Sequence, residues 1–202
     1  MSHSGSVILA ALAIPDTVLF PGIYIVLHIS EPDSLAQLKL ASKDRGYLCA
    51  VLPSGSGALN GCAIHTTGCL AQVQEVQRCG AGFNVRLLGL ARIALSLELE
   101  TTAGRLVQGR LLEESSDDDA LPMARLEGLL TGLAGFPISV LEALGKVAPG
   151  RWLDSVGFYL PVRARLRQAL LAEFSVGRRA KLVLEILEKL ETARPSPVAW
   201  SN

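Results

Sequence analysis

Short apolar runs broken by glycine and proline fill the first half of the chain, and this pattern predicts β-strands. In one run Phe83, Val85 and Leu87 alternate with Asn84 and Arg86, so one face of that strand should be buried and the other wet. The expected strands are Val7–Ile14, Ile23–Ile29, Tyr47–Pro53, Cys69–Arg78, Phe83–Leu99 and Arg105–Glu113.

Two glycine-bearing segments predict tight hairpins between neighbouring strands. Cys79–Gly82 and Thr102–Gly104 both supply residues that tolerate a positive φ. The exception to the strand pattern is Glu31–Asp44, which suits a short helix with Pro32 in its first turn.

The hydrophobic period becomes helical after Ser115–Asp119, which reads as an acidic linker. Ser175 is a candidate N-cap for the last helix, in which Ala180, Val183, Leu184 and Leu187 share one apolar face. The expected helices are Leu121–Ala134, Ile138–Gly145, Pro149–Tyr159, a segment with an apolar stripe through Val162, Leu166, Ala169 and Leu170, and Val176–Glu191.

A run of strands followed by a run of helices predicts an α+β fold. A small barrel is favoured over an open sheet because closure removes exposed edges. We therefore expect a β-rich unit over residues 7–114, a helical unit over residues 120–192 and a flexible tail over residues 193–202.

Composition narrows the class of protein. The chain has 202 residues, 50% of them hydrophobic, and a formal net charge of zero, which argues against a strongly basic nucleic-acid-binding domain. The apolar run Val7–Ile14 is too short to cross a bilayer. A secretory signal would require a basic residue before its apolar run, and none precedes this one. We expect a cytoplasmic protein with no membrane partner, whose four cysteines are reduced.

Candidate chemistry is sparse. Cys62, His65 and Cys69, with Cys49 upstream, have a spacing loosely suited to zinc, but Cys49 and Cys69 fall within expected strands, where cysteine behaves as a small apolar residue. No nucleophile elbow or phosphate-binding loop is present. We predict no metal, no cofactor and no enzymatic activity.

The helical half is basic, with ten Lys or Arg residues against five acids between Lys146 and Arg194. This excess could serve an anion or RNA surface. A solvated helix face is favoured because aromatic stacking partners are few. The arginines concerned are Arg163, Arg165, Arg167, Arg178 and Arg179.

The segment Ile14–Gly22, which reads IPDTVLFPG, and the segment Leu27–Pro32, which reads LHISEP, resemble the start of the Lon-protease N-terminal, substrate-recognition domain family. Gly68–Val76 and Gly82–Ile93 resemble later motifs of the same family, in the same order. The resemblance covers residues 7–192. It implies a PUA-like β pseudo-barrel followed by a C-terminal helical bundle.

The resemblance also implies a function. Since the chain has no phosphate loop and no Ser/Lys protease segment, it reads as a non-catalytic recognition module standing alone. Its expected partners are unfolded or exposed protein segments, with a protease or chaperone acting in trans. An RNA-binding PUA-like barrel is the alternative, although the neutral net charge makes nucleic acid a poor partner.

Relatives place binding residues near a groove between barrel and helices, and the matching positions here are Phe20, Pro21, His28, Glu31 and Pro32. Phe20 and Pro21 have a second interpretation, in which they close the barrel end and fix a turn. Ser30, Asp33 and Ser34 depart from the aromatic, arginine and aromatic residues of many relatives, so a surface framed by those positions is altered here.

Overall fold

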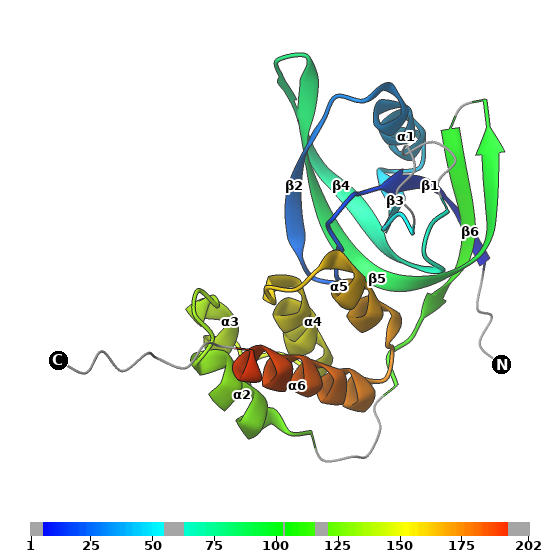
Figure 1. Ribbon diagram of the computed structural model, residues 1–202. Helices are drawn as coiled ribbons and strands as arrows, with labels where there is room; N and C mark the ends of the chain where they lie inside the picture. The colour runs from blue at the N-terminus through cyan, green and yellow to red at the C-terminus, as the bar shows by residue number, and fades with distance from the viewer. Residues whose placement is uncertain (1–5, 55–62, 103, 116–120, 194–202) are drawn as a thin grey trace.

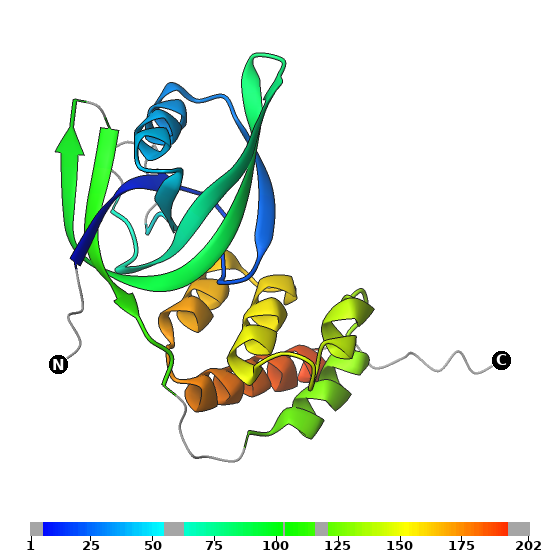
Figure 2. The same ribbon diagram turned by 180° about the vertical axis from the view of Figure 1, so that it is seen from behind.

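The computed structural model describes residues 6–54, 63–102, 104–115 and 121–193. Within these ranges the strands come first and most of the helices follow, below the sheet in Figure 1 and again in the reverse view of Figure 2. The strands are β1 Ser6–Ala13, β2 Tyr24–Ile29, β3 Tyr47–Val51, β4 Thr67–Cys79, β5 Gly82–Thr101 and β6 Gly104–Leu112. The helices are α1 Pro32–Lys43, α2 Met123–Thr131, α3 Ile138–Glu142, α4 Pro149–Tyr159, α5 Ala164–Ala172 and α6 Val176–Thr192.

The strands form one six-stranded sheet in the order β2-β5-β4-β3-β1-β6, and an additional pairing of β5 with β6 closes it into a barrel. The pair β1–β3 is parallel, and the other pairs are antiparallel. Closure is made by β5, whose 20 residues pair with β4 and β2 in the first half and with β6 in the second. The predicted α+β class, with a β-barrel preceding a set of helices, is confirmed.

The hairpin between β4 and β5 forms where the glycine pattern predicted it. Cys79 pairs with Gly82, and Gly80 takes the positive φ of 58° that a side chain would disfavour. Along β5, Val85 and Leu87 are fully buried whereas Arg86 is exposed. The predicted alternation is therefore confirmed, because one face of this strand packs into the barrel.

The helical predictions hold in outline, with corrections to the bounds of two helices and to the buried face of α5. The α4 bounds agree with the prediction, and Ser175 caps α6 by accepting a hydrogen bond from the Arg178 N–H at 3.1 Å. Two helices are shorter than predicted: α2 ends at Thr131 and α3 ends at Glu142. Leu166 and Ala169 were predicted on the apolar stripe of α5 but are exposed, Leu166 to 44%, since α5 turns Leu170 and the polar Gln168 inward instead.

Barrel and helices share one apolar core. Phe20, from the segment before β2, lies fully buried against β5 and packs its ring next to Gly157 of α4. Gln168 of α5 crosses the same boundary, where its amide donates to the Thr67 carbonyl at 2.8 Å. The continuous cluster of buried residues runs from Ala10 in β1 to Leu187 in α6.

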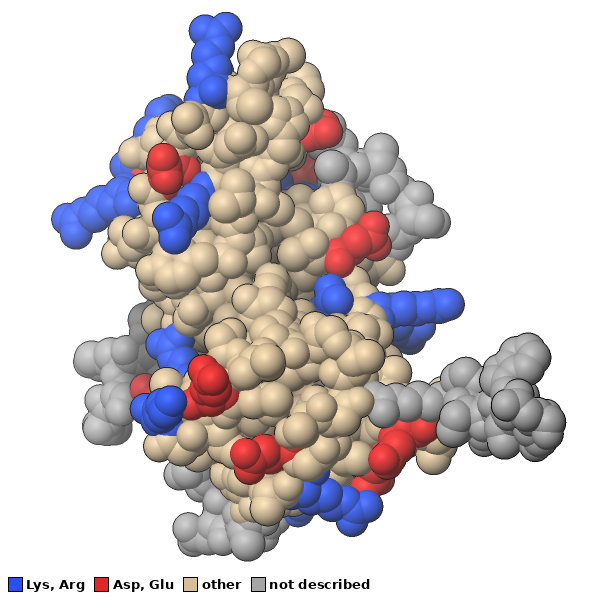
Figure 3. All heavy atoms as spheres, turned by 90° about the vertical axis from the view of Figure 1, so that its left-hand side faces the viewer, with Lys and Arg blue, Asp and Glu red and all other residues tan. Residues whose placement is uncertain are grey.

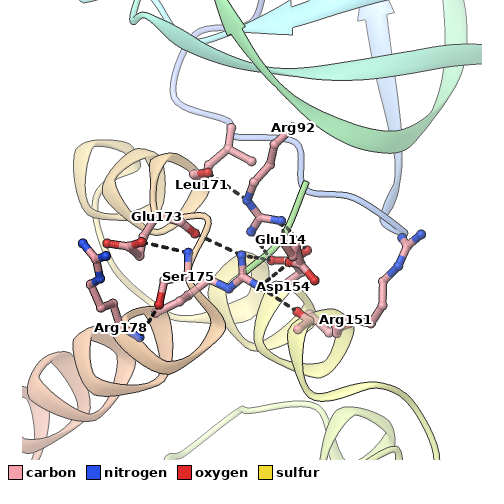
Figure 4. A network of polar contacts seen from close by, with 11 residues as sticks. Arg92, Glu114, Arg151, Asp154, Leu171, Glu173, Ser175 and Arg178 are labelled. Carbon is pink, nitrogen blue, oxygen red and sulfur yellow. Dashed lines mark hydrogen bonds and ion pairs between the residues drawn. The ribbon is translucent and has the colours of Figure 1, made fainter. Parts of the chain in front are cut away.

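A network of buried charges also joins the two halves (Figure 4). Arg92 of β5 forms a bidentate ion pair with Asp154 of α4, and its Nη1 lies 3.0 Å from Glu114 Oε1, just after β6. Arg179 of α6 pairs with the same Glu114 carboxylate and lies 3.6 Å from Asp154. Burying unpaired charges would be costly, so these partners must meet for the chain to fold compactly.

Backbone carbonyls complete this network. Arg92 Nε donates to the Leu171 carbonyl at 2.9 Å, and Arg179 Nη1 donates to the Glu173 carbonyl at 3.1 Å. Burial raises the pKa of Asp154, while the hydrogen bond and charge of Arg92 oppose that rise. Strand β5 is thereby tied to α4, to the end of α5 and, through Glu114, to α6.

Among the described residues, no helix combines the length and the apolar character needed to cross a bilayer.

Candidate functional site

The outer edge of β2 is the candidate site. Strand β2 stands at one end of the sheet order and, among the described strands, pairs with β5 alone. Within the described residues no backbone hydrogen bond joins Tyr24–Ile29 to any other segment. One edge of this strand therefore leaves its N–H and C=O groups available to a further strand.

The entry to β2 determines which groups face that edge. Gly22, with a φ of 81°, donates to the Gly89 carbonyl at 2.8 Å, and the Gly89 N–H donates to the Ile23 carbonyl at 2.9 Å. This is the pattern of a glycine β-bulge, after which bonding to the partner strand alternates. Ile25, Leu27 and Ile29 then bond to β5, and the main-chain groups of Tyr24, Val26 and His28 point outward.

A pocket of about 170 Å³ adjoins this edge on the barrel side. Its walls are mostly apolar and its mouth carries Glu31. Leu27 reaches the pocket from the inner face of β2, and the far wall comes from the end of β1 and the residues after it. The lining residues are Leu12, Ala13, Ile14, Pro15, Leu27, His28, Ile29, Glu31 and Ser34.

A second hollow, of about 300 Å³, lies on the outer face of the same strand. Tyr24 and Val26 are 51% and 66% exposed there, and the Arg86 guanidinium lies 4.9 Å from the centre of the Tyr24 ring. Its remaining lining residues are Glu75, Gln77 and Asn84. Figure 3 shows this side of the molecule, where the middle of the face is uncharged and charged side chains lie toward its margins.

The polar groups of the site are few and exposed. His28 Nδ1 lies 3.0 Å from Asn84 Oδ1 on β5, which orients the ring across the outer face. Glu31 and the nearby Asp16 are exposed and have no ion-pair partner within the described residues. The arrangement suits an extended chain whose side chains are uncharged except for one positive group near the pocket mouth.

The five predicted binding residues separate into two groups. His28 and Glu31 line the pocket, and Pro32 is exposed at the start of α1 beside it. Phe20 and Pro21 are buried, Phe20 completely, so neither presents a side chain to a ligand in this structure. The pocket itself is lined by barrel residues and by the start of α1, without a contribution from α2–α6.

The three cysteines that the structure describes form no metal site with their described neighbours. Cys49 and Cys69 are free and buried, His65 is half-buried and Cys62 lies outside the described residues. Burial raises the pKa of Cys69 to about 12 and that of Cys49 further still. Among the residues that the structure places, no group of three or more His, Cys, Asp or Glu could hold a metal ion.

The predicted basic surface is smaller than expected. Arg179 was predicted on an exposed helix face, but it is fully buried in the charge network. Arg167 is half-buried and donates to the Leu160 carbonyl at 3.2 Å. Arg163, Arg165 and Arg178 remain exposed.

Sequence reasoning missed the open edge and the charge network. The edge had a signal, because Tyr24–Ile29 contains no charged residue and no proline although half of it is exposed. Arg92 also had one, since it sits within an alternating strand where an arginine interrupts apolar residues. Nothing in the spacing of Glu114, Asp154 and Arg179 indicates that they meet.

Comparisons of the sequence with known proteins find relatives among the Lon proteases. Lon protease from Xanthomonas oryzae pv. oryzae is 25% identical over 195 residues, covering 89% of this chain and 23% of the relative. Lon protease 4 from Sorangium cellulosum is 26% identical over 178 residues, covering 84% of this chain and 22% of that protein. The chain thus spans less than a quarter of the length of these relatives.

Solved structures show the same fold. The N-terminal domain of the Mycobacterium avium complex Lon protease superimposes with a TM-score of 0.75 at 16% identity, covering 90% of this chain and 98% of that one. A Lon N-terminal domain protein from Xanthomonas campestris gives a TM-score of 0.63 at 21% identity, covering 94% and 99%. The family model described as the ATP-dependent protease La (LON) substrate-binding domain matches residues 8–189, and the chain therefore belongs to this family.

Proposed function

We propose that this chain is a non-catalytic recognition module that binds exposed or unfolded segments of other proteins. The observation that carries the proposal is the apolar pocket beside an unpaired strand, in a member of a substrate-binding domain family. An exposed apolar segment gains by burial in such a pocket, and main-chain groups of the edge can bind any extended backbone. A protease or chaperone acting in trans would then receive the bound client.

The chemistry of the described residues supports binding rather than turnover. Among the described residues, the buried Arg92, Asp154 and Arg179 are committed to the joint between barrel and helices. The buried Arg105 pairs with Glu98 on the neighbouring strand of the barrel. At the pocket, His28 contacts Asn84, and no hydroxyl or thiol nucleophile is hydrogen-bonded to it in the described structure. Nucleophilic catalysis needs a nucleophile and a base in contact.

The alternative of an RNA-binding barrel loses support because Arg179 and Arg167 are engaged within the fold. The two functions differ in their salt dependence, since phosphate contacts release counterions and apolar burial does not. We expect binding of reduced and alkylated, permanently unfolded lysozyme that persists at high salt, and weak RNA binding that disappears there.

A pocket-filling variant makes this titration specific. Ser34→Trp should occupy the pocket from the first turn of α1 and weaken client binding at least about tenfold, since the apolar contact area is lost. Ser42→Trp is the matched control, because Ser42 is exposed on the same helix roughly 12 Å further along its axis. Tight RNA binding without client binding would show that the proposed function is wrong.

A further inference from the structure

We propose that a client binds as an added strand along the open edge of β2, with its side chains directed alternately into the inner pocket and onto the outer hollow. The inference rests on the proposed function and specifies the binding mode. It commits to one kind of occupant, an extended protein segment rich in β-branched residues, with a lysine or arginine next to the pocket mouth.

Besides β2, the outer parts of β4 and β5 have unpaired edges, and the chemistry of these edges differs from that of β2. Strand β4 beyond Val73 carries Glu75 and Arg78, and strand β5 beyond Leu95 carries Glu98 and Glu100. Each of these two stretches also has a register shift, between Val73 and Glu75 and between Leu95 and Leu97. Charges and bulges are the devices by which proteins prevent a second chain from pairing at an edge.

Strand β2 has none of these devices. Its sequence is YIVLHI, its register against β5 is continuous, and it contains neither proline nor a charged side chain. The two most exposed apolar side chains of this edge, Tyr24 and Val26, stand on its outer face. A regular, apolar and open edge such as that of β2 favours pairing with a further strand, whereas the charged and bulged edges of β4 and β5 oppose it.

The two hollows indicate what the added strand carries. Side chains alternate between the faces of a strand, so every second residue would meet the inner pocket, walled by Leu12 and Ile14, and the others would meet Tyr24 and Val26. Aliphatic β-branched residues fit both surfaces. The unpaired carboxylates of Glu31 and Asp16 complement a positive charge at the inner end.

The first test changes the probe and leaves the protein intact. The probe is a capped peptide of alternating threonine and valine that ends in lysine, compared with two isomers methylated on one or the other alternate set of amide nitrogens. Because successive amides of a strand point to opposite edges, we expect one isomer to lose affinity at least about tenfold and the other to bind like the parent. Equal binding of the parent and both isomers would overturn strand addition.

The second test changes the edge of the protein. The Val26 N–H points away from β5, so Val26→Pro should remove an edge donor, leave the β2–β5 bonds in place and weaken binding at least about tenfold. Val26→Thr is the control, since it keeps the donor and the β-branched shape. Both variants should melt within a few degrees of the parent.

The outcomes separate the two proposals. If Val26→Pro and both methylated isomers bind normally while Ser34→Trp abolishes binding, the chain captures side chains without adding a strand, and only this inference fails. If the parent chain binds neither the peptide nor an unfolded protein, the proposed function fails with it.

Discussion

At the scale of single residues, Gly89 shows how closely the barrel packs against the segment that leads into β2. A Cβ at this position would collide with the Phe20 carbonyl oxygen, which is backbone and cannot swing aside. We expect Gly89→Ala to lower the free energy of unfolding by about 3 kcal/mol, since overpacking forces a backbone shift.

The control for this substitution is Gly128→Ala in α2. A Cβ there meets no atom within 4 Å, so the change should stabilise the protein by about 0.5–1 kcal/mol through helix propensity. Urea denaturation of both variants measures the difference. A neutral Gly89→Ala would contradict the close approach of Phe20.

The buried thiols provide a second prediction at this scale. With its folded pKa raised to about 12 from the model-compound value of 9.0, Cys69 should carry almost no thiolate near neutral pH. The raised pKa contributes stability that is fully present below the unfolded pKa of about 9 and is lost progressively as pH rises from about 9 to about 12. Stability near neutral pH should therefore be insensitive to this group.

The rate of alkylation at each cysteine measures how reactive and accessible its thiol is. In a Cys62→Ser background at pH 8, iodoacetamide should modify the exposed Cys79 at least about a hundredfold faster than Cys49 or Cys69, until denaturant is added. Peptide mass spectrometry reads each site. Comparable rates for all three thiols in the folded protein would show that the barrel interior is open to solvent.

The role of a residue could be predicted from the sequence where near neighbours in the chain determine it. The prediction was wrong where residues distant in the chain determine it. Ser175 was predicted as an N-cap because capping depends on neighbours three residues away. Arg179 was predicted on the surface because arginine is seldom buried, and its partner Glu114 lies 65 residues distant in the chain. No local signal separates the buried Arg179 from the exposed Arg178.

At the scale of elements, the boundaries of strands and helices were largely predictable, since alternation and glycine turns mark them directly. The hairpins at Gly80 and Gly104 agree with prediction for this reason. The exposure of Leu166 did not follow, because α5 is short and its inward face is set by the barrel, where Gln168 binds the Thr67 carbonyl.

The open edge of β2 is an element-scale property that strand prediction alone does not reveal. Closure of the barrel was expected to remove edges, and it gives β1, β3 and β6 a paired strand on each side. It leaves β2 outside the ring because β5 uses the same edge first for β2 and then for β6. The site therefore depends on pairing order, which the hydrophobic pattern does not encode.

At the scale of the whole molecule, the buried charge network holds the barrel against the helices. Asp154→Leu removes a carboxylate that faces Arg92 and Arg179 and leaves two buried guanidinium groups with less compensation. We expect a loss of about 3–5 kcal/mol in the free energy of unfolding.

An exposed ion pair is the control for that loss. Arg125→Met breaks the pair with Glu188, in which both side chains are solvent-exposed, and should cost less than about 1 kcal/mol. Denaturant titration followed by tryptophan fluorescence measures both variants, since Trp152 is buried two residues from Asp154. Similar losses for the two would contradict a structural role for the network.

The most direct measurement of strand addition at this edge is amide hydrogen exchange in β2, residue by residue, with and without the threonine–valine peptide. In the free protein Ile25, Leu27 and Ile29 should be protected by β5, and Tyr24, Val26 and His28 should exchange rapidly. With peptide bound, we predict that these three rapid amides slow at least about tenfold while the others stay unchanged. A bound peptide that leaves Tyr24, Val26 and His28 in rapid exchange would contradict recognition at this edge.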